Sequence, residues 1–113
     1  MSQLISRAAV VIPAGQSVSS ALAIDGKPPT ILEMPTAWTA SPISFAGTGD
    51  GLNYLYIYKE NGLILSLAAT ICRRINLPTK YLSDHLAIMV CSGYWGAIVN
   101  QAADRTIYLE VWE

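Results

Sequence analysis

Charged side chains are the feature that this sequence has least of. Asp, Glu, Lys and Arg make up 13% of the 113 residues, and the net charge at pH 7 is −1. That fraction is about half of what a globular domain usually carries. Beyond Arg73-Arg74 the chain has no basic stretch, so it lacks the charge pattern that binds phosphates. Nucleic acid is therefore not expected as a ligand.

Long apolar runs are also missing. The longest run extends from residue 63 to residue 72, is interrupted by Ser66 and Thr70, and ends at two arginines. It is shorter than the roughly 20 residues that a membrane-spanning helix needs. The apolar segment Ala8–Ile12 stops at Pro13, too early for the apolar region of a secretory signal. We therefore expect no membrane partner and no export signal.

Residues that bind metals or form disulfides are few. Cys72 and Cys91 are the only cysteines, and His85 is the only histidine. Because no export signal is expected, we interpret the cysteines as buried free thiols, with a disulfide between adjacent strands as the less favoured alternative. None of the three has a partner at C-x-x-C or H-x-x-x-H spacing. We therefore expect neither a metal site nor a cofactor, and we expect His85 on the surface or at a sheet edge.

Catalytic patterns are equally scarce. Glu33 and Glu110 fall within expected strands and could pair as the two acids of a glycosidase, but solvent-facing positions that protect a strand edge are favoured. No G-x-S-x-G turn supports a Ser-His-Asp triad. Asp104-Arg105 precedes the last expected strand, where an ion pair or a hydrogen bond at the strand start is favoured over catalysis. We expect a protein without enzymatic activity.

What the chain does have is β-forming sequence, most clearly around Asn61-Gly62. Two apolar runs within residues 52–69 flank this dipeptide, which is typical of a hairpin with a type I′ turn. Tyr54, Tyr56 and Tyr58 alternate with aliphatic residues and therefore share one face. Neither arm has a strongly polar face, so we expect the hairpin inside a larger sheet, covered on both sides.

The remaining pattern predicts one all-β domain over residues 1–113, an antiparallel β-sandwich or jelly roll of about eight strands. Residues 1–7 are expected as an extended N-terminal arm that is ordered against a partner. The further expected strands are Ala8–Ile12, Ser17–Ile24, Thr30–Met34, Ile43–Ala46, Ile71–Leu77, Leu86–Cys91 and Thr106–Trp112, with one helical turn within Pro78–Asp84. In the last strand, Ile107, Leu109 and Val111 should face one side and Tyr108, Glu110 and Trp112 the other.

The low charge and the apolar content of 52% favour a surface that is buried against other chains. Tryptophan and tyrosine on loops commonly anchor such interfaces. The candidate interface contacts are Leu4, Ile5, Trp38, Tyr94, Trp95 and Trp112. Two alternatives stay open: Trp38 could close one end of the core, and the loop aromatics could stack on sugar rings.

Three segments resemble known proteins. Met34–Ala40 (M-P-T-A-W-T-A), followed by Gly49-Asp50-Gly51, resembles the M-P-x-A-W-T-A … x-D-G pattern of small virion proteins of tailed bacteriophages. The run Q-A-A-D-R-T within residues 100–106 resembles the segment that begins their last strand. Residues 11–17 resemble their opening I-P-A-G-x-S. These matches follow the same order along most of the chain.

The resemblance implies a capsid cement or staple (decoration) protein of a short-tailed phage. Such proteins look like jelly rolls that sit on the capsid exterior, often as dimers, and tie neighbouring major capsid protein subunits together. It therefore implies the major capsid protein as partner, a homodimer, synthesis in the bacterial host cytoplasm and a final place on the virion. The alternatives are a carbohydrate-binding jelly-roll module or a structural component of the neck or tail.

Overall fold

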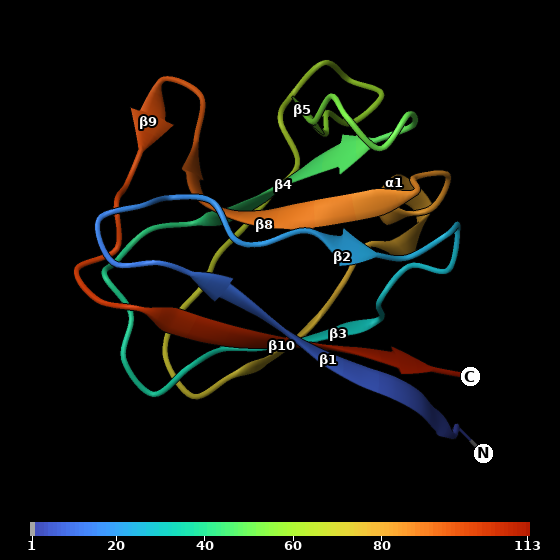
Figure 1. The fold of residues 1–113 in the computed structure, drawn as a ribbon, viewed down its shortest axis with the longest axis horizontal. Coiled ribbons are helices and arrows are strands. Elements are labelled where there is room, and N and C mark those ends of the chain that lie inside the picture. Colours follow the sequence, from blue (N-terminus) through green and yellow to red (C-terminus); the bar gives the residue numbers. More distant parts are fainter. Residues whose placement is uncertain (1) are drawn as a thin grey trace.

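The computed structural model describes residues 2–113 and shows two antiparallel sheets packed face to face (Figure 1). Most strands are short, because Pro, Gly and Asp repeatedly interrupt the apolar runs. Within the described residues the strands are β1 (Leu4–Ile12), β2 (Leu22–Ala23), β3 (Ile31–Glu33), β4 (Ile43–Thr48), β5 (Leu55–Tyr56), β6 (Ser66–Leu67), β7 (Arg74–Asn76), β8 (Ala87–Tyr94), β9 (Ala97–Ile98) and β10 (Arg105–Trp112), and the helical turn is α1 (Thr79–Leu82).

The chain passes repeatedly from one sheet to the other. The four-stranded sheet has the order β1-β10-β3-β7, and the six-stranded sheet has the order β2-β8-β4-β5, with β6 beside β4 and β9 beside β8. This interleaving of two Greek keys is a jelly roll. The predicted antiparallel sandwich is confirmed. The described residues form more strands than the predicted eight or so, and the strand with no predicted counterpart is β9, which adds a short partner to β8.

The core lies between the sheets and follows from residue alternation along the strands. On β10, Ile107 and Leu109 are buried against the other sheet, while Tyr108, Glu110 and Trp112 take the opposite parity, as predicted. Phe45 on β4 is fully buried in the middle of the molecule. The other fully enclosed apolar side chains are Val10, Ile12, Leu32, Ile43, Leu82, Ile88 and Val90.

The turn at Asn61-Gly62 forms, but with different geometry from the prediction. Gly62 has φ +83°, whereas Asn61 keeps a negative φ, so the type I′ turn is wrong. The Gly62 N–H donates to the Lys59 carbonyl at 3.0 Å, and the Lys59 N–H donates to the Leu63 carbonyl at 2.8 Å. This pattern is a type I turn over Glu60 and Asn61 followed by a glycine bulge.

The location predicted for this hairpin is also wrong. Both arms line the same edge of β4: β5 pairs with residues 46–47 and β6 pairs with residues 43–44. Between them the chain leaves the sheet, and only the bridge between Tyr58 and Ile64 joins the two sides. Leu55 and Leu63 are 74% and 61% exposed rather than covered. Because β5 and β6 only border β4 and the chain leaves the sheet between them, these two leucines are not enclosed between layers.

The ends of several strands differ from the prediction as well. β1 begins at Leu4, so residues 4–7 pair with the chain's own last strand in place of a separate arm. β8 continues to Tyr94, three residues beyond the expected strand end at Cys91, and is joined by β9. The expected strand Ser17–Ile24 is reduced to β2.

Cys72 and Cys91 are both free thiols, and the expectation that both are buried holds only for Cys91. Burial raises the pKa of the Cys91 thiol to about 11. His85 is partly exposed, with its Nε2 3.2 Å from the Tyr81 carbonyl oxygen. Among residues 2–113 no helix has the length and apolar character to cross a membrane.

Candidate functional site

One end of the sandwich is built around the buried amide of Gln101. This side chain is 1% exposed, and its Oε1 accepts the Thr39 N–H at 2.8 Å. Its Nε2 donates to the Thr39 carbonyl at 3.0 Å and to the Ser92 hydroxyl at 2.7 Å. The amide therefore replaces a missing backbone partner for Thr39, and it ties this loop to the six-stranded sheet.

Asp104 and Arg105 complete the same end. Asp104 Oδ1 accepts the Ala14 N–H at 2.8 Å, and Arg105 donates to Gln101 Oε1 at 3.1 Å and to Thr39 Oγ1 at 3.3 Å. The hydrogen bond predicted at the strand start is thus present. We call the five residues Ala14, Thr39, Gln101, Asp104 and Arg105 the polar clasp.

The polar clasp unites the sequence motifs that carry the phage resemblance. Ala14 belongs to I-P-A-G-x-S, Thr39 to M-P-T-A-W-T-A, and Gln101 to Q-A-A-D-R-T. The Gly15 N–H also donates to the Gln101 carbonyl at 2.8 Å, and the Gln101 N–H donates to the Gln16 carbonyl at 2.9 Å. These motifs are therefore explained by how they hold one end of the fold together.

The D-G part of the pattern has a similar structural cause. Asp50 Oδ1 accepts the backbone N–H groups of Asn53 and Leu52, each at 2.8 Å, and the Thr48 hydroxyl at 2.9 Å. The hydrogen bonds from Asn53 and Leu52 hold the pKa of this carboxyl well below its usual range. Asp50 is a turn residue after β4.

The two glutamates considered as catalytic acids lie on the outer face of the four-stranded sheet, between two arginines. Arg74 donates to both Glu110 oxygens, at 2.8 and 2.9 Å, and Arg7 Nε lies 2.9 Å from Glu33 Oε2. The crossed pairs Arg7–Glu110 and Arg74–Glu33 are 3.6 Å apart. The four side chains form one ion network across all four strands.

The network fixes the charge of Glu110. This side chain is 3% exposed, and it also accepts the Trp112 Nε1–H at 2.7 Å. Hydrogen bonds from Arg74 in particular lower its pKa to about 2. Glu110 is therefore ionised near neutral pH and is a poor proton donor for glycoside hydrolysis, which requires one carboxyl group with a raised pKa. Trp112 borders a shallow depression of about 430 Å³ beside this network.

The opposite side of the molecule carries exposed apolar side chains. In the segment that precedes the Asn-Gly turn, Leu52 is 83% exposed and Leu55 is 74% exposed, and on the β8–β9 hairpin Trp95 is 74% exposed. β5 and β9 both rise from the outer side of the six-stranded sheet (Figure 1). We call this set the apolar rim. Its members are Leu52, Leu55, Tyr58, Leu63, Trp95 and Ile98.

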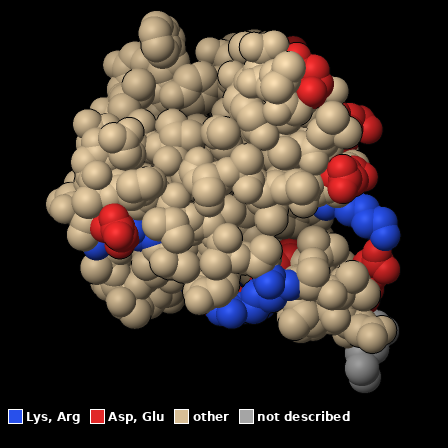
Figure 2. Space-filling view, viewed as in Figure 1, with Lys and Arg blue, Asp and Glu red and all other residues tan. Residues whose placement is uncertain are grey.

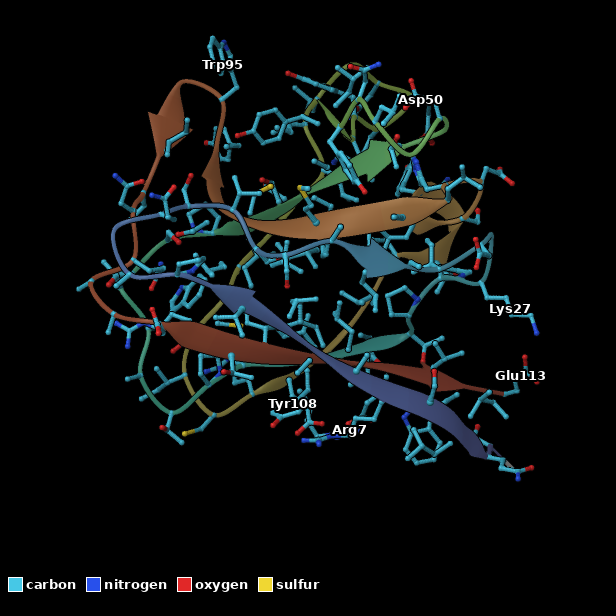
Figure 3. The ribbon with its side chains drawn as sticks, viewed as in Figure 1. Arg7, Lys27, Asp50, Trp95, Tyr108 and Glu113 are labelled. Atoms are coloured by element: carbon cyan, nitrogen blue, oxygen red, sulfur yellow. The ribbon has the colours of Figure 1, made fainter. Side chains whose placement is uncertain are left out.

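Backbone geometry holds Trp95 outward. Gly93 has φ +75°, and a Cβ at this position would overlap the Ala97 carbonyl oxygen, so the chain can reverse closely only with glycine here. Trp95 lies at the tip of the resulting hairpin and points away from the sheets (Figure 3). In the same view, no Lys, Arg, Asp or Glu side chain is seen in the upper left part of the surface, where this hairpin lies (Figure 2).

The structure does not bring the predicted interface contacts together. Leu4 and Ile5 lie on β1, and Leu4 is opposite Trp112 in the four-stranded sheet. Trp38 packs on the core beside the polar clasp, donating from Nε1 to the Ser41 carbonyl at 3.2 Å, as the core alternative expected. Tyr94 and Trp95 form a separate pair at the end of β8, so the predicted contacts fall into different parts of the fold.

Sequence reasoning missed the apolar rim members Leu52, Leu55, Tyr58 and Leu63, because it placed their hairpin inside a sheet. The sequence feature that could have indicated the rim is the lack of a polar face on either arm. This feature is compatible with an exposed contact surface as well as with a strand that is covered on both faces. Within residues 2–113 no group of three or more His, Cys, Asp or Glu side chains is placed to hold a metal ion.

The comparisons with known proteins identify a fold relative. No family model matches the sequence, and the search of curated proteins finds no match. Among solved structures, the crystal structure of the SPBc2 prophage-derived protein YomS is similar, with a TM-score of 0.55 and 10% sequence identity. The similarity covers 96% of this chain and 94% of that chain. At this identity the two proteins share a fold.

Proposed function

We propose that this chain is a structural protein of a tailed-bacteriophage particle, without catalytic activity. In this proposal it binds the outside of the capsid as a homodimer and holds neighbouring major capsid protein subunits together. It is made in the host cytoplasm and ends on the virion. Neither a cofactor nor nucleic acid nor a membrane takes part.

The apolar rim is the observation that carries the proposal. Four of its members, Leu52, Leu55, Leu63 and Trp95, are each more than 60% exposed. Isolated exposed apolar residues are normal, but several on one side of a domain with few charges are typical of a protein interface. Burying apolar surface contributes about 25 cal/mol per Å², so the same contact repeated over a shell would stabilise it strongly.

The phage assignment has two further supports. The three motifs that resemble phage virion proteins fold into one common unit, the polar clasp, so their joint occurrence has a physical reason. The fold relative YomS is itself described as prophage-derived. The absence of catalysis is supported by the ion network, in which Glu33 and Glu110 are both bound by arginines.

The direct test is the copy number of the chain in purified virions, together with its binding to emptied shells. The proposal predicts hundreds of copies and binding that is lost in Leu55→Asp. A count of about six or about twelve, as closed rings of cyclic symmetry would give, would instead assign the chain to the neck or tail. Absence from virions would contradict the proposal.

Exposed Trp95 also favours a second candidate, a carbohydrate-binding module. An aromatic ring at a hairpin tip is a common platform for stacking on sugars. This function predicts a signal on a glycan array that disappears in Trp95→Ala. The absence of any signal on a broad array would remove this candidate and leave the capsid function unaffected.

A further inference from the structure

β1 is an edge strand, with no strand paired on its outer side among the described residues. It is first in the order β1-β10-β3-β7, and its nine residues make it the longest strand in the described part of the chain. A long open edge exposes unpaired backbone groups and can pair with another chain. Natural proteins therefore usually protect such edges.

The direction of the backbone groups can be read from the hydrogen bonds at the end of β1. The Val11 N–H lies 3.3 Å from Ser20 Oγ, and the Ser20 N–H donates to the Val11 carbonyl at 3.1 Å. The backbone of Val11 therefore points away from β10. Because strand residues alternate, the N–H and C=O groups of Arg7 and Ala9 point outward as well. Ser20 covers the edge at Val11 and leaves it open at Arg7 and Ala9.

This edge has little protection. A charged side chain can shield an edge, but Arg7 extends across the sheet face instead, 3.7 Å over the Tyr108 ring and on to Glu33 (Figure 3). The neighbouring residues Ala8 and Ala9 are small and would allow another backbone to approach closely. β1 contains neither proline nor lysine, the residues most often used to block an edge.

We propose that β1 pairs antiparallel with β1 of a second copy, so that the two four-stranded sheets join into one. The register follows from side-chain chemistry. Centring the two-fold axis on Ala8 places Arg7 opposite Ala9 of the other copy and pairs all the open backbone groups. Centring it on Arg7 would place two arginines directly opposite each other, which is destabilising. Centring it on Ser6 would use the irregular pairing between Leu4 and Ser6.

This interface refines the homodimer of the proposed function, and it has a mechanical consequence for it. Each copy keeps its apolar rim, which lies on the other sheet, away from β1. A β1-paired dimer therefore carries two rims and can contact two neighbouring subunits at once. Such bivalency increases the effective affinity for a shell without any new contact.

A cysteine cross-link tests the register. In a pair without mutual hydrogen bonds, the Cα atoms of Ala8 and its symmetry mate would be about 4.5 Å apart, within the range that a disulfide spans. In a Cys72→Ser background, Ala8→Cys should oxidise to a covalent dimer, whereas Ser6→Cys should remain monomeric on a non-reducing gel. Equal cross-linking of both variants, or none of either, would overturn the proposal.

Proline substitution tests the edge independently of any cysteine. Ala9→Pro removes an outward N–H without breaking a bond to β10, and proline is tolerated at such edge positions. Asn76→Pro does the same on β7, the other edge strand. There the Leu77 N–H donates to the Thr30 carbonyl and the Met34 N–H donates to the Arg73 carbonyl, so the backbone groups of Arg73 and Leu77 face β3. Because strand residues alternate, the Asn76 N–H faces outward.

In sedimentation equilibrium of the full chain, Ala9→Pro should weaken dimerisation about tenfold or more, and Asn76→Pro should not. A wild-type chain that stays monomeric up to millimolar concentration, or equal effects of both prolines, would overturn the proposal. Neither experiment involves a capsid. A negative result would therefore contradict the β1 interface without deciding whether the chain binds shells, and a failure to bind shells would not contradict the β1 interface.

Discussion

The polar clasp and the apolar rim differ in whether their side chains find partners within the chain. In the polar clasp, the buried amide of Gln101 and the side chains of Asp104 and Arg105 all have hydrogen-bond partners within the chain. In the apolar rim, Leu55 and Trp95 are mostly in contact with solvent. The clasp is complete without a partner, whereas the rim leaves apolar area that a partner could bury.

This difference bears on the proposed function, because the motifs and the proposed contact surface lie in different regions of the molecule. The three motifs that resemble phage proteins lie at the polar clasp, where they are needed for folding. The apolar rim carries no such motif, so its partner has to be found by experiment. Substitutions in the clasp should reduce stability, and substitutions in the rim should reduce binding alone. The following predictions test this separation, beginning with the largest effect.

The two tryptophans offer the largest contrast. Trp38 packs on the core beside the clasp, so Trp38→Ala should lower the free energy of unfolding by about 2–4 kcal/mol. Trp95 is 74% exposed, and Trp95→Ala should change it by less than about 0.5 kcal/mol. Urea denaturation of both variants measures this. Similar losses would show that Trp95 is part of the core.

Gln101→Ala should have the next largest effect. It removes the partners of the Thr39 N–H and carbonyl and one of the two partners of the Ser92 hydroxyl, so the expected loss is about 2–3 kcal/mol. The matched control is the exposed neighbour Asn100→Ala, for which little change is expected. If the two variants unfold at the same urea concentration, the clasp does not stabilise the fold as described.

Acid should weaken the ion network on the four-stranded sheet. The pKa of Glu110 falls from the usual 4.5 to about 2 on folding, mainly through Arg74. A carboxyl with a lowered pKa stabilises the fold above its unfolded pKa and loses this contribution as pH falls. Between about pH 5 and pH 2 the wild type should lose about 1 kcal/mol through this group, because the arginines are partly solvent-screened.

In Glu110→Gln this part of the pH dependence should disappear, while the stability at pH 7 should already be reduced. The control Glu113→Gln changes an exposed carboxylate outside the network. Thermal unfolding from pH 7 to pH 2 gives the comparison. A Glu110→Gln profile parallel to that of the wild type would show that the network does not hold Glu110 ionised.

The last contrast lies within the Asn-Gly hairpin itself, between an exposed and a buried leucine. Leu63 is 61% exposed, and Leu63→Ser should change stability by less than about 0.5 kcal/mol. Leu65, two residues on, is 3% exposed, and Leu65→Ser should cost about 3 kcal/mol. Equal losses would place the rim in the core and remove the contrast between the two regions.

Local periodicity predicted much of the fold. The alternation of Ile107 and Leu109 with Tyr108 and Glu110 gave both faces of β10 correctly. The apolar run at residues 86–91 predicted a strand that the structure shows within β8, between β2 and β4. The first feature depends on an alternation of period two and the second on a continuous apolar run, so each can be recognised from one strand alone.

The surfaces were harder to predict, because they depend on pairing between distant strands. The ion network joins Arg7, Glu33, Arg74 and Glu110 from four strands, and only the register places them together. The apolar rim exists because β5 and β6 both line one edge of β4. Residue type alone could not separate Trp38 from Trp95, since tryptophan suits a core end and an exposed hairpin tip equally well.

The most direct test of the account compares shell binding and stability on the same samples. Wild type, Leu55→Asp and Gln101→Ala are each measured by urea denaturation and by cosedimentation with emptied capsid shells, at a temperature where all three are folded. We predict that Leu55→Asp keeps its stability and loses binding, while Gln101→Ala loses stability and still binds when folded. Undiminished binding of Leu55→Asp would contradict the claim that the apolar rim is the contact surface.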